Sequence, residues 1–83
     1  MKSKSQIYKH FNYRLKKRYN ISITINEYFL LIEKCKQRKI QIIKPDKYKN
    51  RLIVIIDINN EEVYCIYDKE YCVLRTCLLK DWV

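Results

Sequence analysis

The sequence contains a single histidine, His10, and two arginines follow it at intervals of four residues, Arg14 and Arg18. Residues four apart on a helix are surface neighbours, so a helical segment would align these three side chains in one stripe. Histidine, with an ordinary pKa of about 6.5, suits proton transfer near neutral pH. Arginine grips phosphate oxygens in a bidentate manner. The stripe therefore predicts phosphate chemistry, and the alternative is a solvated basic face.

A helix over about residues 4–19 is predicted to carry this stripe. Ser3 and Gln6 have the spacing of a capping box at its start. The apolar side chains that follow fall on one side of the helix: Ile7, Tyr8, Phe11, Leu15 and Tyr19. The histidine and the two arginines lie along the edge of this apolar side and partly within it. Lys16 and Lys17, by contrast, are predicted on the solvated side.

The rest of the chain predicts one more helix and then strands. Thr24 and Glu27 form a second capping box, which starts a helix over about residues 25–38. β-branched and aromatic runs then predict strands over about residues 40–43, 51–58, 61–67 and 71–79. The sequence thus predicts a single α+β domain over residues 1–83, in which two N-terminal helices precede a four-stranded antiparallel meander sheet.

The link between the second and third predicted strands is Asn59-Asn60. The chain has no glycine, so a turn that needs positive φ must use asparagine, aspartate or lysine. Asn59-Asn60 predicts a two-residue type I′ turn. Under this turn Ile56 opposes Val63, and Val54 opposes Cys65.

The link between the third and fourth predicted strands is less constrained. A turn at Lys69-Glu70 places Cys65 opposite Leu74 and Val63 opposite Thr76. Thr76 then shares a face with Cys65, and Arg75 lies on the other face. Because side chains alternate along a strand, an error of one residue in this turn would exchange those two faces.

The charge of the chain is unevenly distributed. Residues 1–51 carry 15 Lys and Arg against 3 Asp and Glu, a net charge of +12, whereas residues 52–83 carry 3 against 6, a net charge of −3. Such asymmetry favours a polyanionic partner, with nucleic acid ahead of a membrane surface. The alternative is a lysine-rich composition from an A+T-biased coding sequence.

Four cysteines stand at positions 35, 65, 72 and 77, and none is paired in a Cys-x-x-Cys motif. Zinc sites usually show such close pairs, so the spacing predicts neither a metal site nor a cofactor. Three of the four fall in strand-like sequence, where a free cysteine acts as a small buried hydrophobe. The sequence shows no apolar run of about 18 residues and no secretory signal, so it predicts a cytoplasmic protein without a membrane partner.

Several of these residues match the pattern of a known group of proteins. His10 and Arg14 stand on the first helix, Tyr67-Asp68 ends a strand, and Thr76 lies in the last strand. In this order they resemble the barnase/EndoU/colicin/RelE superfamily of small ribonuclease toxins, which includes phage and mobile-element relatives. Several members have Tyr or Lys two residues after the threonine, where this chain has Leu78. The resemblance implies a metal-independent endoribonuclease with an RNA substrate. An antitoxin and a nucleic-acid enzyme are the alternatives for a protein partner, and the sequence does not decide between them.

The resemblance and the chemistry together define a candidate site. His10, Arg14 and Thr76 are the candidate catalytic residues, with His10 as the proton-transfer group and Arg14 as the phosphate clamp. The candidate substrate contacts are Lys17, Arg18, Tyr67 and Arg75.

Other readings of the same residues stay open. A lone histidine at a helix edge also fits a structural role. A basic helical face with tyrosines also suits a nucleic-acid-binding protein that cleaves nothing. A phage or mobile-element inhibitor of a nucleic-acid enzyme would share these features, and an adaptor that pairs through a sheet edge is a further alternative.

Overall fold

Two helices come first in the chain and a four-stranded sheet follows, as the sequence predicts. The computed structural model describes residues 3–83. Its elements are α1 (Lys4–Tyr19), α2 (Ile25–Lys36), β1 (Gln41–Pro45), β2 (Arg51–Ile58), β3 (Glu61–Asp68), β4 (Val73–Leu78) and a short 3₁₀ helix, η1 (Lys80–Trp82). The strands form one antiparallel meander in the order β1-β2-β3-β4. The predicted α+β fold class is confirmed.

Both helices begin at the predicted capping boxes. In α1 the Ser3 hydroxyl accepts from the backbone N–H of Gln6 at 3.2 Å, and the Gln6 side chain accepts from the Ser3 N–H at 3.0 Å. Thr24 and Glu27 make the same reciprocal pair at the start of α2. Each box satisfies two of the backbone donors that a helix start leaves without partners.

The end of α2 and the start of β1 lie slightly away from their predicted positions. α2 ends at Lys36 because Arg38 adopts a left-handed conformation, with a φ of 58°. The backbone N–H of Lys39 donates to the Lys34 carbonyl at 2.9 Å, which closes the last turn. β1 then runs over Gln41–Pro45 rather than 40–43.

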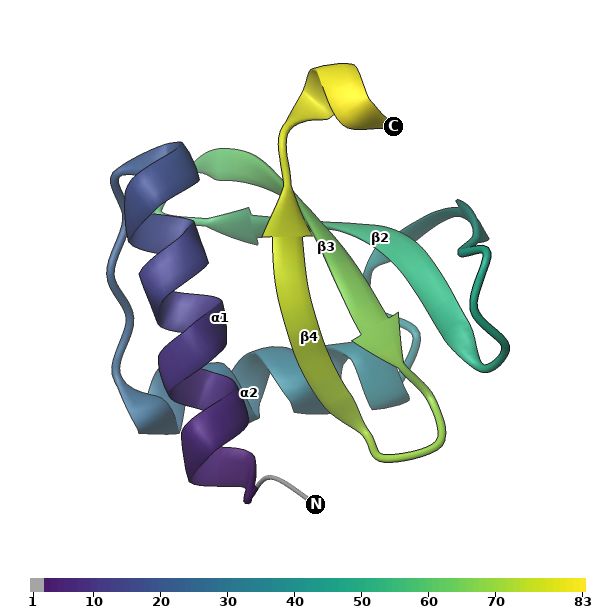
Figure 1. The fold of residues 1–83 in the computed structure, drawn as a ribbon, viewed down its shortest axis with the longest axis horizontal. Coiled ribbons are helices and arrows are strands. Elements are labelled where there is room, and N and C mark those ends of the chain that lie inside the picture. The colour runs from purple at the N-terminus through teal and green to yellow at the C-terminus, as the bar shows by residue number, and fades with distance from the viewer. Residues whose placement is uncertain (1–2) are drawn as a thin grey trace.

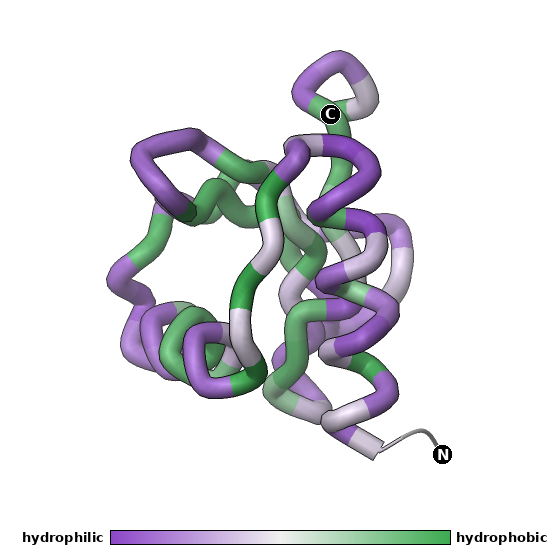
Figure 2. The backbone as a smooth tube through the Cα atoms, turned by 90° about the vertical axis from the view of Figure 1, so that its left-hand side faces the viewer, coloured by the Kyte–Doolittle hydropathy of each residue, from purple (hydrophilic) through white to green (hydrophobic). Residues whose placement is uncertain are grey.

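The helices cover the sheet in different ways. α1 lies beside β4, and α2 crosses behind the lower part of the sheet in the view of Figure 1. The core between them contains the most deeply buried side chains of the helices and strands: Phe11, Leu15, Tyr28, Cys35, Val54, Ile56, Val63, Cys65, Leu74 and Cys77. Figure 2 shows the consequence along the chain, with mostly hydrophobic strands and a mostly hydrophilic α1. Only a narrow stripe of α1 is therefore buried, and its edge remains available for polar side chains.

Tyr28 joins α2 to β4 inside the core. Its hydroxyl donates to the Leu74 carbonyl at 2.8 Å and accepts from the Leu74 N–H at 3.2 Å. Burial raises the pKa of Tyr28 to about 12, although the hydrogen bond to Leu74 acts in the opposite direction. The phenol thus satisfies both backbone groups of Leu74 on the strand that carries two of the candidate site residues.

The β2–β3 hairpin has the predicted register. Ile56 pairs with Val63 and Val54 pairs with Cys65. Asn59 and Asn60 both have positive φ, 52° and 65°, as a type I′ turn requires. This prediction is confirmed.

The predicted β3–β4 register is wrong. Cys65 pairs with Cys77, and Ile66 pairs with Thr76, so Cys65 does not face Leu74. One cause is the connection, where Cys72 adopts a φ of 53° and lies before β4 rather than within the predicted strand 71–79.

An irregularity within the ladder is the second cause. Ile66 pairs with Thr76 but Tyr67 pairs with Leu74, which leaves Arg75 as an extra residue of β4. Cys77 therefore faces the core and is fully buried, whereas Thr76 lies on the opposite face of the sheet. The bulge turns Arg75 and Thr76 toward the same region, which the predicted strict alternation would have separated.

Candidate functional site

The sole histidine lies at the rim of a cavity between α1 and the sheet. The cavity has a volume of about 270 Å³ and is lined by Ile7, His10, Arg51, Arg75 and Thr76. We call it the arginine cavity. The buried stripe of α1 brings its edge against β4, which is how the histidine meets residues more than sixty positions later in the chain. The structure therefore brings His10 and Thr76 to one concave surface.

Asp68 orients both arginines of the cavity. Its side chain is only 4% exposed, and its Oδ2 atom lies 3.0 Å from both Nε and Nη2 of Arg75. The same oxygen lies 3.8 Å from Nε of Arg51. Its other oxygen, Oδ1, accepts from the backbone N–H groups of Glu70 and Tyr71, at 2.9 and 3.2 Å. The carboxylate therefore fixes the guanidinium group of Arg75 by hydrogen bonds and attracts that of Arg51 at a longer distance.

An aromatic ring also supports each arginine. The guanidinium carbon of Arg51 lies 4.8 Å from the centroid of the Tyr48 ring, and that of Arg75 lies 5.4 Å from the Tyr71 ring. Such cation–π contacts leave the edges of a guanidinium group able to donate hydrogen bonds. Because two cations share one carboxylate, one positive charge remains for an anion. The arrangement can hold a phosphate group with little further ordering of the side chains.

Thr76 supplies the neutral donor of the cavity. Its hydroxyl lies 3.4 Å from the carbonyl oxygen of Cys77, which is a weak internal hydrogen bond. A hydroxyl rotates freely, so it can turn to a phosphate oxygen instead. Its presence in the cavity depends on the bulge at Arg75.

Arg14 and Arg18 take other positions on the stripe. Neither lines the arginine cavity. Arg18 donates from Nη1 to the carbonyl oxygen of Cys77, and Nε of Arg14 is buried without a hydrogen-bond partner among residues 3–83. Burial raises the pKa of the Cys77 thiol, and the nearby positive charges of Arg18 and Arg14 partly oppose this effect. Arg18 is thus tied to β4 by a hydrogen bond, and Arg14 lies close enough to β4 for its charge to act on the Cys77 thiol.

Two of the predicted substrate contacts lie away from the cavity. Tyr67 is 2% exposed and belongs to the core, where burial and the adjacent Cys72 raise the pKa of its phenol. A side chain this deeply buried cannot touch a substrate, so the predicted role of Tyr67 is corrected. Lys17 is exposed on α1, with its ammonium 5.8 Å from the Tyr13 ring centroid, and does not line the cavity.

Arg51 is the site residue that the sequence analysis missed. It opens β2 and pairs directly with Asp68 across the β2–β3 hairpin. The confirmed Asn59-Asn60 turn dictates this pairing, so the hairpin register contained the signal. The signal was a pair of opposite charges facing each other at the open end of the hairpin, whereas the charges near its turn are all acidic.

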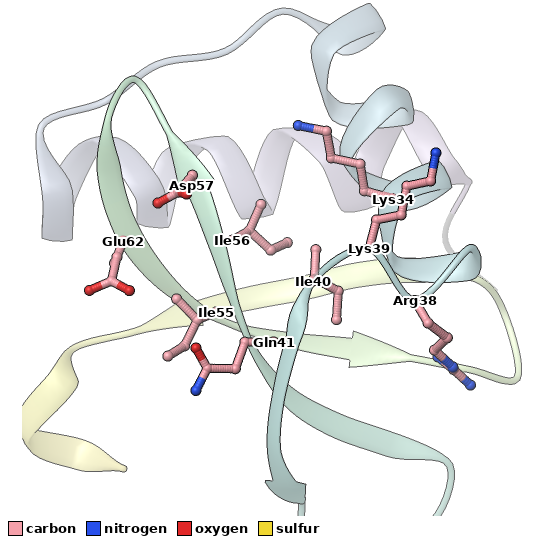
Figure 3. A pocket seen from close by; sticks show the side chains of 9 residues that line it. All are labelled: Lys34, Arg38, Lys39, Ile40, Gln41, Ile55, Ile56, Asp57 and Glu62. Carbon is pink, nitrogen blue, oxygen red and sulfur yellow. The ribbon is translucent and has the colours of Figure 1, made fainter.

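A second concave region has a very different lining (Figure 3). We call it the mixed-charge cleft; its volume is about 460 Å³. Lys34, Arg38 and Lys39 lie on one side, Asp57 and Glu62 lie on the other, and isoleucines lie between them. No ion pair within 4.0 Å joins the two sides among the residues that the structure describes. All five charged side chains are exposed, and Arg38 also donates a long hydrogen bond of 3.3 Å from Nη1 to the Cys35 carbonyl, so its guanidinium group is held by α2 and not by the acidic side of the cleft.

Comparisons of the chain with protein-family models, with curated proteins and with solved structures find no match. Within residues 3–83, no group of three or more potential metal ligands comes together, and no helix has the length and apolar character of a membrane span. The arginine cavity is therefore the feature of the molecule that points to a function.

Proposed function

We propose that this protein binds RNA at the arginine cavity and cleaves it without a metal ion. The observation that carries the proposal is that the sole histidine, two carboxylate-anchored arginines and a threonine hydroxyl line one cavity. Cleavage of RNA by its own 2′-hydroxyl requires few groups from the protein. A proton must move, and the charge on the phosphorane must be stabilised.

The chemical step follows from these roles. The 2′-oxygen attacks the adjacent phosphorus, the bond from phosphorus to the 5′-oxygen breaks, and the products are a 2′,3′-cyclic phosphate and a 5′-hydroxyl. In this proposal the His10 imidazole, whose type has an ordinary pKa suited to proton transfer near neutral pH, accepts the proton of the 2′-hydroxyl, and the departing 5′-oxygen takes a proton from the resulting imidazolium or from water. Arg51 and Arg75 donate to the equatorial oxygens, where negative charge develops, and the Thr76 hydroxyl adds a neutral donor.

The charge distribution supports a polymeric substrate over a small phosphate. Residues 1–51 carry a net charge of +12, far more than one phosphate group needs. A basic surface of this kind attracts a long polyanion and accelerates its association. DNA lacks the attacking hydroxyl, so it would bind without being cleaved.

The resemblance to small ribonuclease toxins also supports RNA cleavage, but with different arginines at the phosphate. His10 and Thr76, two residues of that pattern, line the cavity, and Arg51 and Arg75 provide the cations there. Arg14, expected as the phosphate clamp, lies against β4 instead. In this proposal Arg14 positions α1 and does not contact the reacting phosphate.

Binding of RNA without cleavage is the second candidate. His10 is the only cavity residue suited to proton transfer near neutral pH, and cleavage needs both a base and an acid. If His10 cannot act both as the base and as the acid, the cavity favours a protein that binds RNA without cleaving it. Such a protein could equally be an inhibitor that occupies the RNA site of a nucleic-acid enzyme.

One assay separates the two candidates. End-labelled RNA is incubated with the wild-type protein in EDTA and compared with His10→Ala, Thr76→Ala and Lys16→Ala. We expect His10→Ala to reduce cleavage by about 10²–10⁴-fold without changing RNA affinity. Lys16, exposed on α1 and outside the cavity, provides the matched control, and its loss should leave the cleavage step unchanged.

Two results would overturn the cleavage proposal. Equal cleavage by the wild type and by His10→Ala would assign the activity to another site or to a contaminant. Absence of cleavage across diverse RNAs, together with salt-dependent binding, would establish the binding protein instead. The appearance of a 2′,3′-cyclic end that depends on His10 would support the proposed step.

A further inference from the structure

The chain's single tryptophan lies at the end of the α1 stripe. Trp82 belongs to η1 and is 56% exposed, which is unusual for the largest apolar side chain. The guanidinium carbon of Arg18 lies 4.5 Å from the Trp82 ring centroid. One face of the ring is therefore covered by a cation, while more than half of the side chain remains in contact with solvent.

Hydrogen bonds tie the groups around this ring to the sheet and to η1. Arg18 donates to the carbonyl of Cys77, so the cation beneath the ring is itself fixed to β4. The Tyr19 hydroxyl donates to the carbonyl of Leu78 and accepts from the N–H of Tyr64 at 3.2 Å, which ties the end of α1 to the sheet. The backbone N–H of Trp82 donates to the Leu79 carbonyl at 2.9 Å. We call the exposed ring, together with the Arg18 guanidinium group beneath it, the platform.

The platform and the arginine cavity lie along the same helix. His10 and Arg18 are two turns apart on one stripe of α1, which corresponds to about 12 Å along the helix axis. A few nucleotides of an extended single strand span such a distance. Arg14 lies between them on the same stripe, and although its Nε atom is buried, its charge adds to that of Arg18 along the path from the cavity to the tryptophan.

We propose that Trp82, backed by Arg18, stacks on an unpaired base of single-stranded RNA whose backbone phosphate occupies the arginine cavity. This inference rests on the proposed function for the phosphate position and adds the class of RNA. Stacking on an aromatic ring requires a base that is not stacked in a duplex, so the site selects single strands. Every base presents a flat π face, so the platform has little sequence preference.

The fluorescence of Trp82 provides a direct probe, because no other tryptophan contributes to the signal. The wild-type protein is titrated with 2′-O-methyl RNA, which binds but lacks the attacking hydroxyl. We expect single-stranded oligonucleotides to quench the fluorescence. Inorganic phosphate and an RNA duplex of the same sequence should leave it nearly unchanged.

Affinity measurements on variants test the contribution of the ring. Trp82→Ala should weaken binding of the single-stranded oligonucleotide by about 5–100-fold, as expected for the loss of one stacked base. Trp82→Phe, which keeps a ring, should retain most of the affinity. Tyr13→Ala is the matched control, because Tyr13 is a 60% exposed aromatic on α1 with its own cation, Lys17, and its loss should change the affinity little.

Separate outcomes distinguish this inference from the proposed cleavage. Quenching together with loss of affinity in Trp82→Ala would support stacking even if no RNA is cleaved. Unchanged fluorescence in the wild type, or wild-type affinity in Trp82→Ala, would overturn stacking even if cleavage is demonstrated. Quenching whose midpoint is the same in Arg75→Ala would overturn the link between the platform and the cavity. The quenching experiment on the wild-type protein gives a result whether or not the variants fold.

Discussion

The arginine cavity and the mixed-charge cleft show how differently one small domain can display charge. The cleft is the larger of the two, about 460 Å³ against 270 Å³. In the cavity, Arg51 and Arg75 converge on Asp68, which is nearly inaccessible to solvent. In the cleft, exposed lysines and carboxylates face one another without an ion pair.

This difference indicates which region is prepared for an anion. Lysine ammonium groups on flexible stems must be ordered when a ligand binds, which costs conformational entropy. Guanidinium groups already held by a carboxylate and an aromatic ring have lost most of that freedom during folding. The smaller region is therefore the better candidate site, because preorganisation matters more than volume.

The largest expected effect comes from removing the charge that organises the cavity. Asp68→Asn should lower the free energy of unfolding by about 2–3 kcal/mol, because two arginines would lose their shared anion in a partly buried setting. Asp57→Asn in the cleft should change it by no more than about 0.5 kcal/mol, since Asp57 is exposed. Urea unfolding measures both, and equal losses would contradict the contrast between the two regions.

The next effect concerns the strand behind the cavity. Tyr28→Phe should cost about 1–2 kcal/mol, because it leaves the N–H and carbonyl of Leu74 without their buried partner. Tyr13→Phe, at an exposed position, should cost little. Chemical unfolding at neutral pH gives both values.

The raised pKa of Tyr28 adds a pH signature. The phenol has a pKa of about 12 when folded and 10.0 ordinarily, so its contribution to stability is complete below pH 10 and is lost as the pH rises through 12. In Tyr28→Phe this part of the alkaline decline should be absent. An identical decline in the wild type and the variant between pH 10 and 12 would show that Tyr28 ionises equally in both states.

A smaller effect is expected in the salt dependence of RNA binding. The logarithm of the affinity should fall with the logarithm of the salt concentration by about one unit of slope per phosphate contact. Arg51→Ala and Arg75→Ala should each reduce the slope by about one unit, whereas Lys34→Ala should leave it nearly unchanged. Circular dichroism verifies that each variant is folded. Affinity that does not vary with salt would remove the electrostatic model altogether.

The smallest effect is expected from chelators and reductants. All four cysteines are free, and Cys65 and Cys77 are buried cross-strand partners without a disulfide. Within residues 3–83 no three potential metal ligands come together, and we expect EDTA and a thiol reductant to leave the melting temperature unchanged. A large decrease with either reagent would show that a metal or a disulfide supports the fold.

Local signals in the sequence were sufficient for the helix starts and the first hairpin. Each capping box is completed within four residues, and the Asn59-Asn60 turn fixes the register of its hairpin through adjacent backbone angles. Short-range hydrogen bonds and φ preferences act before any tertiary contact forms. The order of elements and the basic character of residues 1–51 were likewise readable from the residues alone.

The composition of the cavity required contacts that no local rule contains. The β3–β4 connection depends on Asp68 accepting from two backbone groups, and the bulge at Arg75 moves Thr76 to the other face. Because side chains alternate along a strand, one extra residue reverses the assignment of every position beyond it.

Long-range packing determined where each cation acts. Arg14 and Arg18 were predicted as phosphate ligands on a helical stripe. In the structure Arg18 donates to the Cys77 carbonyl of β4, and neither arginine lines the arginine cavity. The sequence analysis assigned no role to Arg51, yet the carboxylate of Asp68 brings it beside Arg75. Sequence spacing describes neighbours on one element, whereas a binding cavity forms where separate elements meet, and the burial of their apolar faces decides which polar edges come together.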